Sequence, residues 1–476
     1  MMTDKPDIVV IGGGPGGYPA AIRAAQLGKR VTLIEKGMIG GECLNMGCIP
    51  SKALLSATKL LHEIKHKAPD MGISTGKVSV NMKKLHEWRI GVQEKLVSGV
   101  EQLLKANTVE IVTGKARFKG PQKLEVSLNA GGKSDITAED VIIATGASFH
   151  PPEGLSFDGT RILSPYQALT MNKHPAKVLV VGAGDIGLEI ATLMKRFGSD
   201  VSIVGSATEL FSELDARTAS VVKRDLRQAG IELMLNTGIS GIELIEDDEA
   251  KATLTSEKGD TDVLTVNCVI LTTGKLPNTI DLGLKEVGIN TTNDGAIIID
   301  EKQQSNVKHH YAIGDCTGPP YLAQRATKQG IVAAEVAAGI DSSFDYRAMP
   351  RLIFSEPEIA FVGLNETEAK AAGFDIVSGQ ASFAVSGRAL TEDEASGVVR
   401  IIADAKSSAV LGAQLVGPRA TDLISEMSFA LEMGSLLEDL SFTSHPHPTL
   451  PEMIMEAAAS AQGKAINVAN SRRNKQ

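Results

Sequence analysis

Two cysteines in a glycine-containing segment are the residues best suited to do chemistry in this chain. Cys43 and Cys48 lie within Gly-Gly-Glu-Cys-Leu-Asn-Met-Gly-Cys-Ile-Pro-Ser-Lys, residues 40–52, and are half of the four cysteines among 476 residues. A disulfide that closes so short a loop stabilises a fold little, so a bond that opens and closes is the better interpretation. Pro50 suits the first turn of a helix, whose N-terminus favours a thiolate. The pair is therefore predicted to be a redox-active dithiol.

An internal duplication supplies elements that could position this dithiol. Each copy has an apolar strand, a Gly-x-Gly-x-x-Gly turn, a helix and a second buried strand. The glycines are Gly12, Gly14 and Gly17 in the first copy and Gly182, Gly184 and Gly187 in the second. Such glycines bring backbone N–H groups close to a pyrophosphate at the helix N-terminus. Two copies with the same surrounding elements predict two dinucleotide sites.

The second strands of the two copies end differently. Glu35 lies eighteen residues after Gly17, where a carboxylate binds the ribose hydroxyls of an adenosine. The equivalent position after Gly187 is Gly205, which offers no carboxylate. No Arg or Lys follows Gly205 until Arg217, so a holder for a 2′-phosphate is also missing. The second site therefore leaves the choice between NAD and NADP open.

Composition and charge exclude several classes of function. The net charge is −9 and only 4% of the residues are aromatic, which disfavours binding to nucleic acid or to an anionic membrane. No apolar run reaches the roughly 18 residues of a membrane span. Four cysteines in so long a chain suit a reducing compartment. We expect a cytoplasmic enzyme with no nucleic-acid or membrane partner and no metal site.

Taken in order along the chain, these features resemble the pyridine nucleotide–disulfide oxidoreductase family over essentially all 476 residues. The matching blocks are Gly12–Gly17 with Glu35, Cys43–Lys52, Ala144–Gly146, Gly182–Glu189, Gly274–Asn278, Gly314–Asp315 and His447–Glu452. The resemblance implies an α/β fold with two Rossmann-like domains and an α+β C-terminal dimerisation domain. The implied boundaries are 1–147 and 274–346 for FAD binding, 148–273 for NAD(P) binding and 347–476 for dimerisation.

The resemblance also implies roles for the residues of the dithiol site. Cys43 would form a mixed disulfide with the substrate, and Cys48 would face the flavin of FAD. His447 would be the acid–base that serves Cys43 of the other subunit, because an imidazole titrates near the operating pH. Glu452 would orient His447. His445, two residues earlier, is interpreted as structural because the family's base precedes Pro-Thr.

Further residues would hold the cofactors. Lys52, one helical turn after Cys48, would point at the flavin and pair with Glu189. The other FAD contacts would come from Gly12, Gly14, Gly17, Glu35, Gly114, Thr145, Gly146, Asp315 and Ala323. The NAD contacts would come from Gly182, Gly184, Gly187, Glu189, Gly205 and Gly274. Cys268 and Cys316 are interpreted as packing thiols.

The reaction implied is the oxidation of a dihydrolipoyl group with reduction of NAD⁺. The enzyme would be a homodimer that serves the lipoyl domain of a 2-oxoacid dehydrogenase or glycine cleavage complex. A reductase of glutathione-like or coenzyme-A-like disulfides would use the same groups in reverse with NADPH, and the lack of basic residues after Gly205 argues against it. A mercuric reductase needs a second cysteine pair near the C-terminus, and no cysteine follows Cys316. A mainly docking subunit is the third alternative, although every catalytic residue is present.

Three positions depart from the family pattern. Gly205 stands where NAD-using members carry an acid, Gln324 replaces a common His, and Lys275 replaces a frequent Arg before Pro-Asn. None of the three belongs to the predicted thiol chemistry. They make the nicotinamide cofactor the most open part of the prediction.

Overall fold

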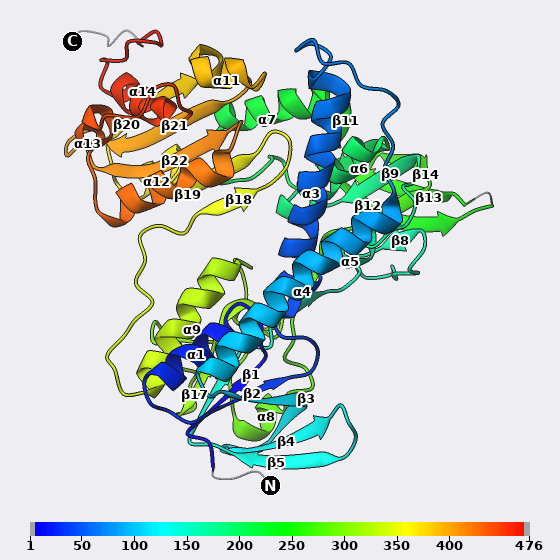
Figure 1. Ribbon diagram of the computed structural model, residues 1–476, viewed down its shortest axis with the longest axis vertical. Helices are drawn as coiled ribbons and strands as arrows, with labels where there is room; N and C mark the ends of the chain where they lie inside the picture. The colour runs from blue at the N-terminus through cyan, green and yellow to red at the C-terminus, as the bar shows by residue number, and fades with distance from the viewer. Residues whose placement is uncertain (1–4, 247, 471–476) are drawn as a thin grey trace. The chain divides into compact units, whose positions relative to one another are not determined.

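The computed structural model describes residues 5–246 and 248–470 (Figure 1). The chain divides into two compact units. The first unit consists of Met1–Leu54, Asn81–Pro152 and Thr273–Asp345, and the second of Leu55–Val80, Glu153–Thr272 and Tyr346–Gln476. Each unit contains one of the two glycine-rich turns. Among the described residues, no helix combines the length and the apolar character needed to cross a bilayer.

The first unit contains a seven-stranded sheet of order β17-β6-β1-β2-β3-β4-β5. Its strands are β1 (Ile8–Ile11), β2 (Val31–Glu35), β3 (Glu110–Gly120), β4 (Lys123–Leu128), β5 (Lys133–Thr137), β6 (Asp140–Ile143) and β17 (His310–Ala312). The five strands from β17 to β3 are parallel, and β4 and β5 extend them as an antiparallel meander. A separate two-stranded ribbon pairs β7 (Ala147–Phe149) with β16 (Lys275–Pro277).

Helices cover both faces of this sheet because successive residues of β1 point to opposite sides. Ile8 and Val10 pack with alanines of α1 and α9, whereas Val9 and Ile11 pack with Phe118 and the residues of α8. The helices of the unit are α1 (Gly17–Gln26), α2 (Gly41–Asn45), the start of α3 (Cys48–His62), α4 (Met82–Ala106), α8 (Leu284–Val287), the 3₁₀ turn η2 (Gly314–Thr317) and α9 (Ala323–Ala337). The small alanines of α1 and α9 let the two helices lie close together (Figure 1).

The second unit repeats the parallel arrangement in a five-stranded sheet of order β11-β10-β9-β15-β8. Its strands are β8 (Ile162–Leu163), β9 (Lys177–Val181), β10 (Asp200–Val204), β11 (Ile231–Met234) and β15 (Cys268–Leu271). The accompanying elements are η1 (Glu63–Lys67), α5 (Pro165–Ala168), α6 (Asp185–Phe197), α7 (Ala216–Gln228) and an antiparallel sheet of β12 (Thr237–Leu244), β13 (Ala250–Ser256) and β14 (Thr261–Val266).

The rest of the second unit is an antiparallel sheet of order β18-β19-β22-β21-β20 packed against helices. The strands are β18 (Arg351–Ile353), β19 (Ile359–Gly363), β20 (Ile376–Ser382), β21 (Val398–Asp404) and β22 (Val410–Val416). The helices are α10 (Glu366–Ala371), η3 (Phe383–Val385), α11 (Gly387–Thr391), α12 (Ala420–Glu432), α13 (Leu437–Phe442) and α14 (Glu452–Ala461). Core residues such as Ile401, Met427 and Ile454 join the sheet to α12 and α14.

The predicted fold class is confirmed: two parallel α/β sheets of the Rossmann type are followed by an α+β region. The predicted strand–turn–helix–strand order is present in both copies, with β1, α1 and β2 matched by β9, α6 and β10. Because the carboxyl ends of parallel strands meet at one edge, each glycine-rich turn lies at the edge where ligands bind in such sheets.

Candidate active site and dinucleotide sites

The two predicted cysteines lie at neighbouring helix ends. Cys43 is in the middle of the short helix α2, and Cys48 is the first residue of α3. Both residues are partly buried, and both are thiols that form no disulfide in this structure. Pro50 lies in the first turn of α3, as expected from the sequence. The N-terminus of α3 therefore stabilises a thiolate on Cys48.

The dithiol segment packs directly on the first glycine-rich turn. The N–H of Gly40 donates to the carbonyl of Gly13 at 2.8 Å. A Cβ placed on Gly41 would lie 2.7 Å from the Cα of Gly14, so only glycine allows this approach. The side chain of Asn45 braces the segment by donating to the carbonyls of Ile39 and Gly41 at 3.0 and 2.9 Å. The thiols are thus fixed to the backbone that forms the first predicted dinucleotide site.

The two thiols interact, and their environment distinguishes them. The hydrogen bond with Cys48 is the largest cause that raises the pKa of Cys43, followed by burial and by the charge of Cys48. The ammonium of Lys52, one turn into α3, acts in the opposite direction. Cys43 therefore holds its proton more tightly than an ordinary thiol while it is hydrogen-bonded to Cys48.

The two glycine-rich turns have the same geometry. Gly12 and Gly182 have φ of 106° and 119°, a conformation that side chains rarely adopt. A Cβ on Gly17 or Gly187 would lie 1.8 Å from the carbonyl oxygen of Gly12 or Gly182, respectively. In contrast, a Cβ on Gly184 would meet nothing within 4 Å, and one on Gly14 only the Cα of Gly41 at 3.8 Å. The outer glycines are needed for packing, while the middle ones face space that fits a pyrophosphate.

The ends of the second strands differ in the structure as in the sequence. The buried carboxylate of Glu35 accepts the N–H groups of Gly13 at 2.6 Å and Gly37 at 2.7 Å, which fixes it at the end of β2. At the matching place after β10, a Cβ on Gly205 would lie 2.8 Å from the Cβ of Ala183. In the first copy the acid Glu35 therefore faces Gly13. In the second copy Gly205 faces Ala183.

His447 and Glu452, predicted to be the acid–base and the residue that orients it, are in contact at the start of α14. Nδ1 of His447 lies 2.8 Å from Oε1 of Glu452, the first residue of α14. The imidazole is 81% exposed. The pKa of Glu452 is lowered: burial raises it, but hydrogen bonds from the Thr449 N–H and from His447 outweigh burial. A carboxylate at Nδ1 holds the ring and leaves Nε2 for proton transfer.

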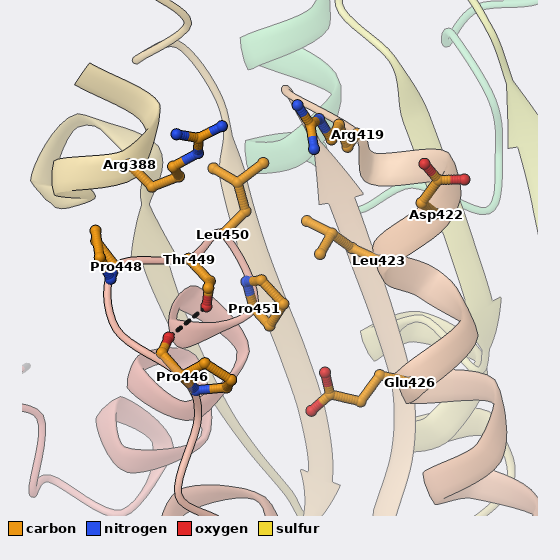
Figure 2. A pocket seen from close by; sticks show the side chains of 10 residues that line it. All are labelled: Arg388, Arg419, Asp422, Leu423, Glu426, Pro446, Pro448, Thr449, Leu450 and Pro451. Atoms are coloured by element: carbon orange, nitrogen blue, oxygen red, sulfur yellow. Dashed lines mark hydrogen bonds between the residues drawn. The ribbon is translucent and has the colours of Figure 1, made fainter. Parts of the chain in front are cut away.

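The loop that carries His447 borders a cavity of about 430 Å³ in the second unit (Figure 2). Residues 446 and 448–451 form one side of it, and the Thr449 hydroxyl donates to the carbonyl of Pro446 at 2.6 Å. The side chain of His445 is only 5% exposed and anchors the loop: Nε2 lies 2.9 Å from Glu426 on α12, and Nδ1 lies 3.0 Å from the carbonyl of Thr443. These contacts fit the interpretation of His445 as structural, while the imidazole of His447 is exposed.

Comparison with known proteins identifies the chain. Residues 6–330 match the model of the family described as pyridine nucleotide-disulphide oxidoreductase, and residues 349–458 match the dimerisation domain of that family. The chain belongs to this family. The dimerisation domain makes the oxidoreductase a homodimer. Exposed apolar side chains on α12, just after it and on α13, namely Phe429, Met433 and Phe442, offer a surface for a partner subunit.

Named relatives match this oxidoreductase over nearly its whole length. Proteins called dihydrolipoyl dehydrogenase are 41% identical in Geobacillus stearothermophilus, 42% in Haloferax volcanii and 41% in Bacillus subtilis, over 97%, 98% and 97% of both chains. The crystal structure of LpdA from Mycobacterium tuberculosis has a TM-score of 0.87 at 28% identity and covers 95% of this chain and 98% of its own. The flavoprotein disulfide reductase RclA from Escherichia coli, at 24% identity and a TM-score of 0.85, shows the likeness of fold alone.

The remaining FAD candidates of this oxidoreductase lie in the first unit. Asp315 is in η2, and Ala323 begins α9, where backbone N–H groups are available. The carbonyls of Thr145 and Gly146 accept the side-chain and backbone N–H groups of Asn278 at 3.0 and 2.9 Å. Gly114 pairs with Leu128 between β3 and β4, where a Cβ would lie 2.6 Å from the carbonyl oxygen of Ser127.

Two NAD candidates have different surroundings. Glu189, buried on α6, accepts the N–H of Phe354 at 3.1 Å. Gly274 belongs to the first unit, and its carbonyl accepts the N–H of His150 at 2.8 Å. The expected pair between Lys52 and Glu189 would join the two units and stays a prediction, as does the action of His447 on Cys43 of the partner subunit.

The other two cysteines are packing residues in the structure. Both are fully buried, and burial raises the pKa of Cys268 to about 12 and that of Cys316 to about 11. The thiol of Cys316 donates to the carbonyl of Ile313 at 3.2 Å. Neither thiol is therefore ionised near neutral pH.

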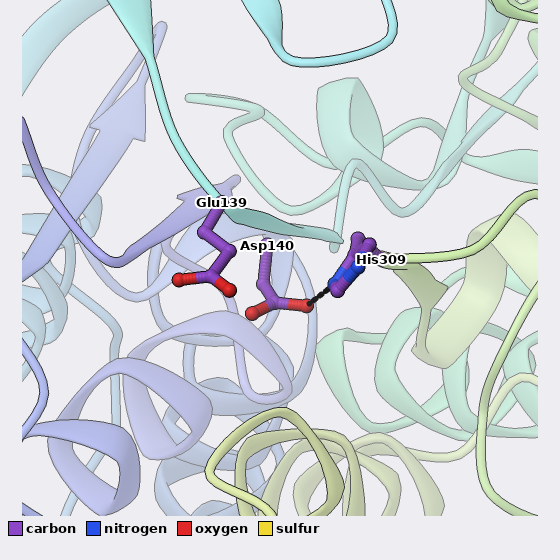
Figure 3. A group of neighbouring side chains, drawn as sticks. All are labelled: Glu139, Asp140 and His309. Atoms are coloured by element: carbon purple, nitrogen blue, oxygen red, sulfur yellow. Dashed lines mark hydrogen bonds and ion pairs between the residues drawn. The ribbon is translucent and has the colours of Figure 1, made fainter.

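Sequence reasoning did not single out a group formed by Glu139, Asp140 and His309 (Figure 3). Nδ1 of His309 lies 3.0 Å from Oδ1 of Asp140, and Glu139 is exposed beside them. Asp140 begins β6, so the group lies at the end of the strands opposite to the glycine-rich turn. A hydrogen bond between His309 and Asp140, which joins the starts of β17 and β6, accounts for their closeness.

Proposed function

We propose that this oxidoreductase oxidises dihydrolipoyl groups to lipoyl groups and reduces NAD⁺ through a Cys43–Cys48 disulfide. The placement of the dithiol against the first glycine-rich turn carries the proposal, because it sets the sulfurs beside a dinucleotide site. The relatives named dihydrolipoyl dehydrogenase, 40–42% identical at full length, support the same substrate and cofactors.

FAD is assigned to the first unit and NAD to the glycine-rich turn of the second. The space facing Gly14 and the fixed carboxylate of Glu35 fit the pyrophosphate and ribose of FAD, and the space facing Gly184 fits the pyrophosphate of NAD. In domain terms, residues 1–147 and 274–346 would bind FAD, 148–273 NAD(P), and 347–476 the second subunit. Bound FAD supplies the acceptor that takes two electrons from a dithiol and delivers a hydride to NAD⁺.

The thiol chemistry uses residues of this chain at each step. His447 of the partner subunit removes a proton from one substrate thiol, and the resulting thiolate attacks Sγ of Cys43 in the Cys43–Cys48 disulfide. A mixed disulfide forms, and Cys48 leaves as the thiolate. The second substrate thiol gives its proton to Cys43 and attacks the substrate sulfur of the mixed disulfide, which releases the lipoyl disulfide. This leaves Cys43 protonated and Cys48 ionised, the distribution that their mutual hydrogen bond favours.

The partner proposed for this chemistry is the lipoyl domain of a 2-oxoacid dehydrogenase or glycine cleavage complex, in the cytoplasm, where other thiols stay reduced. The choice of NAD rather than NADP follows the relatives and the lack of a cation near Gly205 in the sequence.

A steady-state comparison tests the function. The purified holoenzyme is assayed with dihydrolipoamide and either NAD⁺ or NADP⁺, and with oxidised glutathione and either NADH or NADPH. We expect turnover with dihydrolipoamide and NAD⁺, and values of kcat/KM lower by about two orders of magnitude or more for the other combinations. Faster reduction of glutathione by NADPH would assign the protein to the low-molecular-weight disulfide reductases instead.

A further inference from the structure

A buried lysine of the first unit is held between two carboxylates. Nζ of Lys275, on β16, lies 2.8 Å from Oδ2 of Asp315 and 3.1 Å from Oε1 of Glu42. The side chain is only 12% exposed. Its ammonium also lies 5.2 Å from the ring centre of Tyr321 and 5.8 Å from that of Phe149. Two acids and two ring faces thus surround one cation.

The partners of this lysine connect two parts of the proposed site. Glu42 immediately precedes Cys43 in α2, and Asp315 is the residue proposed to hold FAD. Lys275 stays charged because Glu42 and Asp315 raise its pKa by more than burial lowers it. In a site of low dielectric, removing that cation takes a balancing charge from Asp315 and from Glu42, the residue before Cys43.

Several charges act on Cys43 from the elements around it. Cys48 and Lys52 face it from α3, Tyr18 from α1, and Glu42 from its own helix. Lys52 favours the thiolate of Cys43, whereas Glu42 and Cys48 oppose it. The opposition from Glu42 is limited as long as its charge is balanced by Lys275.

We propose that Lys275 is a positioning residue for the dithiol, which neutralises Glu42 beside Cys43 and at the same time holds Asp315. The reactivity of the Cys43 thiol then depends on a lysine that acts through Glu42. The inference deepens the proposed function, since it rests on Cys43 as the thiol that meets the substrate.

Alkylation of the reduced holoenzyme by iodoacetamide tests this dependence. The rate at Cys43 is followed at pH 7 by mass spectrometry of the peptide that contains residues 37–52. We expect Lys275→Met to slow alkylation about threefold or more and Glu42→Gln to speed it, because thiolate, not thiol, reacts. In the Glu42→Gln background, Lys275→Met should no longer slow the reaction. In the otherwise wild-type chain, Lys275→Arg should keep the wild-type rate.

Two controls separate the proposal from a structural effect. Lys115→Met removes the ammonium from an exposed ion pair with Asp281 in the same unit and should leave the rate unchanged. FAD absorbance shows whether each variant stays folded. A wild-type rate in FAD-loaded Lys275→Met, or equal slowing in both backgrounds, would overturn the proposal. If Lys275→Met does not fold, Glu42→Gln alone decides: faster alkylation supports the proposal, and an unchanged rate contradicts it.

These outcomes do not depend on the lipoyl substrate. Alkylation requires only the reduced thiols, whereas the proposed function is measured by turnover of dihydrolipoamide. A failure of the proposed role of Lys275 can therefore be distinguished from a failure of the proposed function.

Discussion

Nδ1 of His447 lies 2.8 Å from one oxygen of Glu452, and the other oxygen of that carboxylate accepts the N–H of Thr449, also at 2.8 Å. A carboxylate can only accept hydrogen bonds when it is ionised, so Nδ1 carries a hydrogen and Nε2 of the neutral imidazole carries the lone pair. Because the imidazole is largely exposed, Nε2 is accessible to a group from outside the subunit. This arrangement fits a base that serves another chain.

Replacing Glu452 by Gln should lower kcat for dihydrolipoamide by about tenfold or more, because the amide no longer fixes the tautomer of His447. The measurement is steady-state turnover at saturating NAD⁺, with FAD content as the check on folding. Glu438→Gln, on the exposed side of α13, is the matched control and should keep wild-type kcat. Equal kcat for Glu452→Gln and wild type would contradict the orienting role.

The same pair predicts a pH dependence of stability. The pKa of Glu452 is lower in the folded protein than in the unfolded chain, so the carboxylate stabilises the fold above its ordinary pKa. That contribution is lost as the pH falls through the lowered value. The difference in unfolding free energy between wild type and Glu452→Gln should therefore be present at pH 7 and shrink below about pH 4 in urea titrations. A difference that grows at acid pH would contradict the assigned cause.

The glycines of the second turn should separate into packing and ligand positions. Gly187→Ala should destabilise the fold by about 3 kcal/mol, because its Cβ would lie 1.8 Å from the carbonyl oxygen of Gly182. Gly184→Ala meets no atom within 4 Å and should leave the melting temperature unchanged, yet weaken NAD⁺ about tenfold by filling the pyrophosphate space. Thermal melts and equilibrium NAD⁺ titrations check both. Unchanged NAD⁺ affinity in Gly184→Ala would show that the cofactor lies elsewhere.

An acid at position 205 should improve NAD⁺ binding when it is given space. A Cβ at this position would lie 2.8 Å from the Cβ of Ala183, whereas in the first copy Glu35 faces Gly13. We expect Gly205→Glu combined with Ala183→Gly to tighten NAD⁺ about tenfold, and Gly205→Glu alone to tighten it less. NADP⁺ binding should not improve, since a 2′-phosphate would meet the new carboxylate. No gain in the double variant would mean that another group already binds the ribose.

The features that sequence could predict are those encoded locally. The glycine-rich turns prescribe strand, turn and helix together, so both parallel sheets follow from Gly12–Gly17 and Gly182–Gly187. The helix start at Cys48 follows from Pro50, and the contact between His447 and Glu452 spans only five residues.

Contacts between residues that are far apart in the sequence could not be predicted from a local pattern. Lys275 lies 233 residues from Glu42 in the chain, and His309 lies 169 residues from Asp140. In the sequence, Lys275 was only a departure from a family pattern. The ammonium of Lys275 meets the carboxylates of Glu42 and Asp315 only in the folded chain, where β16 pairs with β7. The raised pKa of Cys43 could not be predicted either, because it depends on how Cys43 and Cys48 meet across the turn.

Cys48→Ser removes the thiol that is proposed to pass electrons from the dithiol to FAD. The measurement is NADH formation from dihydrolipoamide and NAD⁺ by the FAD-loaded variant, with Cys268→Ala, a packing thiol in β15, as the control. We expect Cys48→Ser to retain FAD but to lose turnover by about a thousandfold or more, and Cys268→Ala to stay active. Lipoamide-dependent NADH formation at the wild-type rate in Cys48→Ser would contradict the proposed role of the dithiol.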